Sequence, residues 1–573
     1  MKKTLLFYFI LAFFATKSYA QCLMYEVPLT ERVQKAEVIV EGEVLHTRSF
    51  WNESKTMIYT EYYIEISTVL KEKVPTPMPL SAAILQVEGG QVEDFVVEVE
   101  PSLHLNIGDK GIFFLTEKHL KPYYRPIFEP YADVQGFIRY ETDAKSATDV
   151  FAKYDISKLR KEITHFTHFT PIILNPLTLQ PPKNTRGPAI SSFSPANLSV
   201  GTGEILTITG SGFGTKTGSA KVQFTDPDYQ AVTFSDAAAA DYLSWTDTEI
   251  KLTMNGGNAG AGTGKIKVFD AAGTSASSTN TLTVPFHRQR GDLGNDNGTG
   301  GYTFQFNNEF AQNPSAVAAV TRAIESWRCA TGVNFGIGTN TAVDTNLTTD
   351  NVNVIRWGVL SSGLLGKCYW SYNICSSTNY DPRKDIDVTF ASTNASWNFG
   401  PAATPNGKSD LESVALHELG HGLGLGHVSN AGHSMFPVIM SGTDVRTPAA
   451  NGDELGGEYV VNFGSNVTTV CNGIGKMIPL NANNCAFTTD KENALSPYIS
   501  IQPNPNQGRF YLTMGNMSQA KISIWNSLGQ KVADIPNEEK VVQEVYLQGI
   551  SSGIYYVKVS VGSKTWEQKM VVE

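Results

Sequence analysis

The stretch that most constrains this chain is His417-Glu418-Leu419-Gly420-His421-Gly422-Leu423-Gly424-Leu425-Gly426-His427, which reads H-E-x-x-H-x-x-G-x-x-H. His417 and His421 are four residues apart, so on a helix they face the same side. Gly424 can adopt the left-handed conformation that ends a helix, which would bring His427 back toward the pair. Three imidazoles leave the fourth tetrahedral position of a zinc ion open to water. Glu418 is then placed to polarise that water rather than to bind the metal.

The residues before the motif predict a helix from about Ser409 to Leu423. Ser409 and Glu412 have the spacing of an S-x-x-E capping box, and acidic residues suit the positive end of the helix dipole. Apolar residues at helical spacing supply a face to bury. The alternative interpretation is an amphipathic helix that merely carries two surface histidines.

The motif resembles the zinc helix of the metzincin metalloproteases. The resemblance implies that His417, His421 and His427 are Zn2+ ligands and that Glu418 is the catalytic general base. Metzincins also place a methionine in a turn beneath the metal. Met435, followed by Phe436-Pro437, is our preferred residue for that turn, and Met440 is the alternative.

We assign residues 286–466 to a metzincin-like α+β domain. Asn313-Pro314 is a helix-start signal, and the apolar spacing that follows predicts a helix to Trp327. Strands are expected around it, with a closing helix over 453–461. The polar loop 291–301 could hold Ca2+ through oxygen ligands, although a plain flexible loop is the preferred interpretation.

Residues 1–20 read as a secretory signal peptide: Lys2 and Lys3 precede an apolar run, and Ser18-Tyr19-Ala20 fits a cleavage site. No other stretch is long and apolar enough to predict a transmembrane segment.

An even number of cysteines in an exported chain favours disulfides. We expect the pairs Cys368–Cys375 and Cys471–Cys485, which would leave Cys22 and Cys329. A second role for Cys22, as a thiolate on the metal of a latent enzyme, stays open.

All-β domains are expected on both sides of the α+β domain. Residues 21–170 read as a β-rich N-terminal domain, a small barrel or sandwich, and 171–187 as a proline-rich linker. Residues 188–285 resemble an IPT/TIG domain, an immunoglobulin-like sandwich that usually spaces or binds and carries no chemistry. After a linker over 467–492, residues 493–573 resemble the C-terminal sorting domain of the type IX secretion system, which is a β-sandwich.

These observations predict a secreted or cell-surface zinc endopeptidase, whose partners are a protein or peptide substrate and the type IX secretion machinery. The net charge of −10 argues against nucleic acid as a partner. The competing hypothesis is a cell-surface adhesin or binding protein whose metal site is vestigial or structural.

Overall fold

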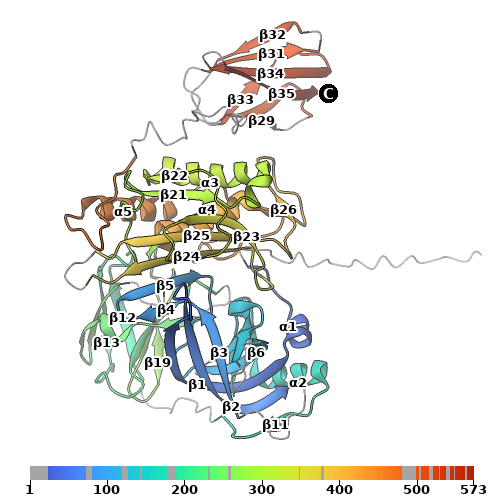
Figure 1. Cartoon of the computed structure of the whole chain (residues 1–573). Coiled ribbons are helices and arrows are strands. Elements are labelled where there is room, and N and C mark those ends of the chain that lie inside the picture. The colour runs from blue at the N-terminus through green and yellow to red at the C-terminus, as the bar shows by residue number, and fades with distance from the viewer. Residues whose placement is uncertain are drawn as a thin grey trace, which may run out of the picture.

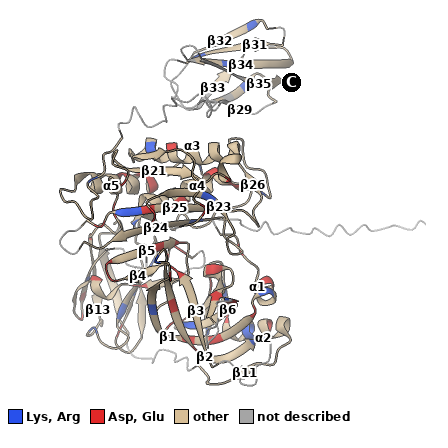
Figure 2. Cartoon of the chain, in the orientation of Figure 1, with Lys and Arg blue, Asp and Glu red and all other residues tan. Residues whose placement is uncertain are grey.

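The computed structural model describes residues 24–72, 81–118, 127–141, 145–177, 187–229, 233–255, 260–346, 349–375, 380–480 and 499–573, the last with gaps at 503–504, 515–519, 528, 537–541, 548 and 562–563. The predicted signal peptide, Cys22 and Cys485 lie outside these ranges. Within them, no helix has the length and apolar character needed to cross a membrane. Basic and acidic residues are interspersed over the elements seen in Figure 2.

The first unit, which we call the barrel domain, is a β-sheet that closes on itself. Its strands run in the order β1-β2-β3-β7-β6, and a further pairing of β1 with β6 completes the ring. Valine, isoleucine and phenylalanine side chains fill the interior, while helices α1 and α2 cover a second apolar cluster outside it. The elements are α1 Leu29–Lys35, β1 Val38–Trp51, β2 Ile58–Lys71, β3 Ala82–Glu88, β6 Lys110–Lys118, β7 Ile127–Pro130, β8 Phe137–Tyr140, β9 Ser146–Thr148, β10 Lys153–Asp155, α2 Ile156–Thr167 and β11 Ile172–Ile173.

The second unit, the sandwich domain, has two four-stranded sheets packed face to face. Their inner faces form one apolar core, as the alternating sequence pattern predicts. The sheets have the orders β12-β13-β17-β16 and β15-β14-β18-β19. The strands are β12 Ala189–Ser194, β13 Ile205–Ser211, β14 Lys221–Thr225, β15 Phe234–Asp236, β16 Tyr242–Trp245, β17 Glu249–Thr253, β18 Ile266–Phe269 and β19 Ser275–Ser277.

The third unit, the α/β domain, is built on a sheet with the strand order β22-β21-β23-β25-β24. All pairings are parallel except that of β24 with β25, which is antiparallel. Its elements are β20 His287–Arg288, β21 Tyr302–Phe306, α3 Pro314–Thr331, β22 Phe335–Ile337, β23 Asn353–Gly358, β24 Gly366–Asn373, β25 Arg383–Ala391, β26 Trp397–Asn398, β27 Ser409–Asp410, α4 Leu411–Leu423, β28 Leu425–Gly426 and α5 Asp453–Asn466.

Helices α3 and α4 pack together and share the core of this domain with the sheet. The side chain of Asn313 accepts a hydrogen bond from the amide of Ala316, which confirms the predicted start of α3. Trp327 is fully buried, and its indole N–H donates to the carbonyl of Leu416 in α4 at 2.7 Å. This bond holds the centre of α4 against α3.

A hairpin from the barrel domain extends the α/β sheet beyond β24. Strands β4 (Gly90–Val92) and β5 (Phe95–Glu100) pair with each other, and β5 pairs antiparallel with β24. The sheet therefore has seven strands, two of which come from another unit (Figure 1). Val96 of β5 belongs to the core of the α/β domain.

The C-terminal unit is a separate sandwich of a three-stranded and a four-stranded sheet around one apolar core. Its strands are β29 Ile499–Gln502, β30 Arg509–Met514, β31 Lys521–Asn526, β32 Lys531–Ile535, β33 Val542–Tyr546, β34 Gly553–Val561 and β35 Lys564–Val572.

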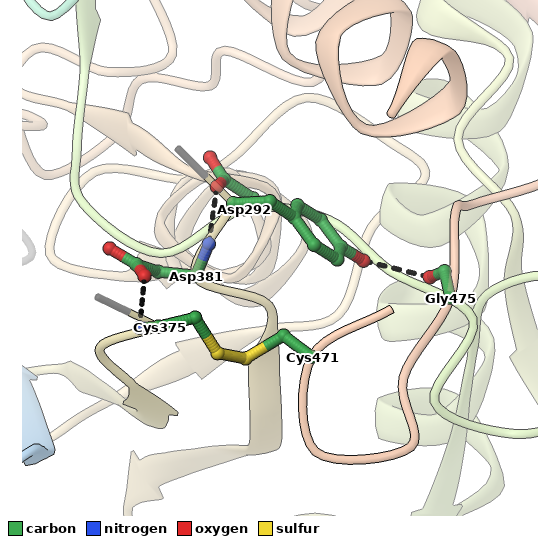
Figure 3. Close-up of a disulfide and its surroundings, with 6 residues drawn as sticks. Asp292, Cys375, Asp381, Cys471 and Gly475 are labelled. Carbon is green, nitrogen blue, oxygen red and sulfur yellow. Dashed lines mark hydrogen bonds between the residues drawn. A yellow bond between two sulfur atoms is a disulfide. The ribbon is translucent and has the colours of Figure 1, made fainter. Parts of the chain in front are cut away.

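The predicted disulfide pairs are wrong. Cys375, in the connection between β24 and β25, is bonded to Cys471 after α5, with a Cα–Cα distance of 6.3 Å (Figure 3). Cys368 is a buried free thiol, and Cys329 is also disulfide-bonded. The amide of Cys375 donates to Asp381 at 2.8 Å, so Asp381 lies beside the bridge. Proximity in sequence favoured local pairs, whereas the fold brings together cysteines that are 96 residues apart.

Candidate metal centre

One residue caps each end of helix α4. Asp410, rather than the predicted Ser409, caps its N-terminus, where the carboxylate accepts the amide of Ser413 at 3.0 Å. Glu412 takes no part in a capping box and instead pairs with Arg322 at 2.7 Å. Gly424 ends the helix with φ 114°, and its amide donates to the carbonyls of Gly420 and His421. The glycine bend predicted by the motif is therefore present.

The three motif histidines converge on one point. The Nε2 atom of His417 lies 2.9 Å from that of His421 and 3.2 Å from that of His427. Within the described part of the chain, they are the one group of three His, Cys, Asp or Glu residues whose ligand atoms gather within 4.8 Å. All three side chains are buried.

Each imidazole has a hydrogen-bond partner on its other ring nitrogen. The Nδ1 atoms of His417 and His421 lie 2.7 and 2.9 Å from the carbonyl oxygens of Ser434 and Leu425. A carbonyl oxygen can only accept, so Nδ1 carries the proton and the lone pair of Nε2 is left for a metal. Burial lowers the pKa of both rings well below the ordinary value, which favours the neutral form that binds metal.

The Nδ1 atom of His427 has a different partner. It lies 2.7 Å from Oδ1 of Asp228, which belongs to the sandwich domain and is 199 residues away in the sequence. The sequence carried no local signal for this contact, and the IPT/TIG-like region was expected to carry no chemistry. The fold places one of its carboxylates directly behind the third imidazole.

Glu418 is a buried carboxylate with no hydrogen-bond partner for either oxygen among the described residues. Burial raises its pKa well above the ordinary value, and the positive charge of Lys367 opposes this only in part. The carboxylate lies against β24, since a Cβ added to Gly366 would come within 2.5 Å of Oε1. A buried carboxylate without a partner is costly, so this one fits a site completed by a metal-bound water.

The two candidate methionines differ sharply in their surroundings. Met435 is 1% exposed, and its Sδ lies 2.2 Å from the position that a Cβ on Gly420 would take. Met435 thus packs against the zinc helix between its two histidines. Met440 is 56% exposed. The geometry favours Met435 for the turn beneath the metal.

The asparagine side chains of the loop over 291–301 accept hydrogen bonds from within the loop. The Oδ1 atom of Asn297 accepts the amides of Thr299 and Gly301, and that of Asn295 accepts the amide of Gly300. These bonds give two of its polar side chains a structural role. A Ca2+ site stays a prediction.

Three segments of the chain match known protein families. Residues 297–456 match the matrixin model, residues 188–284 match the IPT/TIG domain, and residues 500–573 match the secretion system C-terminal sorting domain. These matches confirm the predicted composition of an α+β metzincin-like domain, an immunoglobulin-like domain and a sorting domain. The sorting domain indicates export to the cell surface or extracellular space.

No curated protein matches the chain. Among solved structures, the N-terminal four Ig domains of Dscam1 isoform 9.44 are 8% identical, with 77% of this chain and 80% of that chain covered and a TM-score of 0.11. A BSP domain of a biofilm associated protein is 7% identical, with 93% and 81% covered and a TM-score of 0.11. TM-scores this low carry no argument about the fold.

Proposed function

We propose that the chain is an exported zinc endopeptidase in which Glu418 acts as general base. One observation carries the proposal: three imidazoles have converging Nε2 atoms, and the helix that carries two of them also carries Glu418, a buried carboxylate with no hydrogen-bond partner among the described residues. The matrixin match supports a zinc metalloprotease, and the sorting domain supports secretion. We also propose the domain boundaries predicted from the sequence.

In this proposal, His417, His421 and His427 hold the metal through Nε2. Their Nδ1 partners fix the orientation of each ring before the metal arrives, which lowers the cost of organising the site. Zinc bound there supplies a Lewis acid and brings the pKa of a coordinated water toward neutrality.

Glu418 would accept the proton of the attacking water and deliver it to the leaving amine. Its surroundings leave it available for this role, because no described residue donates a hydrogen bond to either carboxylate oxygen. The neighbouring strand β24 would align an extended peptide substrate by backbone hydrogen bonds, as strand addition does.

The binding-protein alternative is not favoured. A structural zinc site is closed by four protein ligands, whereas three histidines gather here. Glu418 has no hydrogen-bond partner among the described residues and would have no role in such a site.

Replacement of Glu418 by glutamine tests the proposal. Glu418→Gln is expected to keep zinc while hydrolysis of a peptide library falls by about 10²–10⁴-fold, because only the proton acceptor is lost. Glu309→Gln changes an exposed carboxylate of the same domain and serves as the matched control. Unchanged hydrolysis in Glu418→Gln would remove the general-base assignment, and a folded wild-type chain that binds no zinc would remove the mechanism.

A further inference from the structure

The sandwich domain contacts the α/β domain near the metal centre at several points besides Asp228. An added Cβ at Gly262 would come within 2.3 Å of Ser429 Oγ, two residues beyond His427. The amide of Arg288 donates to the carbonyl of Val200 at 2.9 Å, and its guanidinium donates to that of Gly201 at 2.9 Å. These contacts hold the sandwich domain against the strand β20, which pairs with β28 just before His427.

Asp228 is oriented within this interface. Its own amide donates to Oδ1 of Asp226 at 3.0 Å, and its carboxylate accepts from Nδ1 of His427 at 2.7 Å. The other two ligands have backbone carbonyls as partners, which lie in the α/β domain itself. We infer that Asp228 is a positioning residue for the third metal ligand, and that the α/β domain has a complete metal centre only with the sandwich domain docked.

The physical reason is the hydrogen bond to a carboxylate. A charged acceptor on Nδ1 fixes the tautomer and the ring orientation and makes Nε2 a better donor to the metal, and loss of such a partner typically weakens metal binding about 10–100-fold. His427 follows the glycine bend, outside the helix, so its ring lacks the restraint that α4 gives to His417 and His421.

This inference rests on the proposed zinc centre. It can be tested by measuring zinc affinity, which does not require catalytic turnover. We expect Asp228→Ala to weaken zinc binding about 10–100-fold in competition with a chromophoric chelator. We expect Asp228→Asn, which keeps an uncharged acceptor, to lose less, and the cobalt-substituted chain to change its visible spectrum in both variants. Asp236→Ala is the matched control, because its side chain is 50% exposed, against 52% for Asp228, and pairs with Lys221 in the same domain.

Unchanged zinc affinity and an unchanged cobalt spectrum in Asp228→Ala would overturn the inference while leaving the proposed function intact. A wild-type chain without zinc affinity would overturn both.

The burial of strand β24 supports a second inference, independently of Asp228. Residues Gly366 to Tyr372 are all buried, although β24 is the outermost strand that the α/β domain itself contributes to the sheet. Strand β5 covers its free edge over six residue pairs, from Phe95 opposite Asn373 to Glu100 opposite Cys368. The ladder ends close to the metal centre, because Gly366, two residues before Cys368, touches Glu418.

Side chains strengthen this docking. Lys367 of β24 pairs with Asp133 of the barrel domain at 2.9 Å, and Tyr369 donates to Glu88 at 3.2 Å. Val97 and Val99 of β5 are buried with Tyr369 in one apolar cluster.

The barrel domain also covers the chain that enters β24. The amide of Tyr25 donates to the carbonyl of Gly363 at 2.7 Å, and Met24 forms a β-bridge with Leu364. Met24 shares an apolar cluster with Leu364 and with Val438, which follows the Met435 turn. The N-terminal segment thus contacts both the chain that enters β24 and the residues that follow Met435.

We propose, on the basis of the proposed function, that the barrel domain blocks the site by occupying the place of an extended peptide on β24. Backbone pairing on an edge strand accepts any extended segment, so β5 and a peptide substrate exclude each other. Removing the barrel domain exposes the edge.

The test uses a chain with a specific protease recognition sequence inserted within residues 178–186, between the barrel and sandwich domains. The probe is a short peptide hydroxamate, which needs the metal and the strand edge but no turnover. We expect its Kd to fall about tenfold or more after cleavage and removal of the barrel domain, since the competent fraction rises. Asp133→Asn removes one charge partner of Lys367 and is expected to lower the hydroxamate Kd of the uncut chain, but by less than removal of the barrel domain does. Asp94→Asn, at the exposed hairpin tip, is the matched control.

An equal Kd before and after removal of the barrel domain would overturn this inference. Tighter hydroxamate binding without any peptide hydrolysis would support it and count against the proposed function instead.

Discussion

Replacement of Asp410 by alanine tests how the N-terminus of the zinc helix is held. Asp410 is 1% exposed and accepts hydrogen bonds from the amide and hydroxyl of Ser413. It also accepts from Nε and Nη2 of Arg446, at 2.9 and 2.6 Å. The side chain therefore caps α4 and neutralises a guanidinium that is 17% exposed.

The expected cost has two parts. Loss of an N-cap side chain costs about 1 kcal/mol. Removal of one partner of a buried ion pair costs about 3–5 kcal/mol, and the lower end applies here because Arg446 keeps the carbonyls of Pro401 and Ala402 at 2.7 and 2.9 Å. We expect Asp410→Ala to destabilise α4 by about 3–4 kcal/mol.

Hydrogen exchange of the α4 amides, read by mass spectrometry in the zinc-loaded chain, measures this locally, since a chain of several domains does not unfold in two states. Asp155→Ala is the matched control, because Asp155 caps α2 through the amide of Lys158 but is exposed. It should lose less stability than Asp410→Ala, and only within α2. Adding Arg446→Met to Asp410→Ala should restore part of the loss. A loss below about 1 kcal/mol in α4, or no recovery in the double variant, would refute the reasoning.

Three further changes have defined outcomes. Met435→Ala should cost about 2–5 kcal/mol in thermal or denaturant unfolding of the α/β domain, whereas Met440→Ala should stay within about 0.5 kcal/mol; the reverse order would exclude Met435 from the turn. Burial raises the pKa of the Asp385 carboxyl to about 7, and the unfolded chain releases that proton near pH ~4, so the free energy of unfolding should fall as pH rises between these values. In metal-free buffer, Asp385→Asn should reduce this dependence of the free energy of unfolding on pH. If the dependence is unchanged, groups other than Asp385 cause it. Cys375→Ser with Cys471→Ser should destabilise the domain by about 2–5 kcal/mol without loss of zinc, and an unchanged midpoint would show that the bridge contributes nothing.

The sequence alone determined the candidate metal-binding segment and the types of domain. Its information there is local: a helical spacing places His417 and His421 on one face, and a glycine permits the bend before His427. Strand alternation and turn residues likewise indicated β-rich units on both sides of the α/β domain. Even within this local information, the prediction of Ser409 as N-cap was wrong and Asp410 takes that position, because neighbouring residues of similar capping propensity are distinguished only by the partners that the fold brings.

The tertiary structure alone decided which distant segments meet at the site. Asp228 reaches His427 across 199 residues, β5 covers β24, and Cys375 bonds to Cys471. No periodicity or spacing encodes such contacts. The first two depend on how the sandwich and barrel domains dock against the α/β domain, and the third depends on how the α/β domain itself folds. A free strand edge or an imidazole nitrogen can pair with any partner of suitable chemistry. The docking of the barrel domain therefore decides the partner of β24, and the docking of the sandwich domain decides the partner of His427.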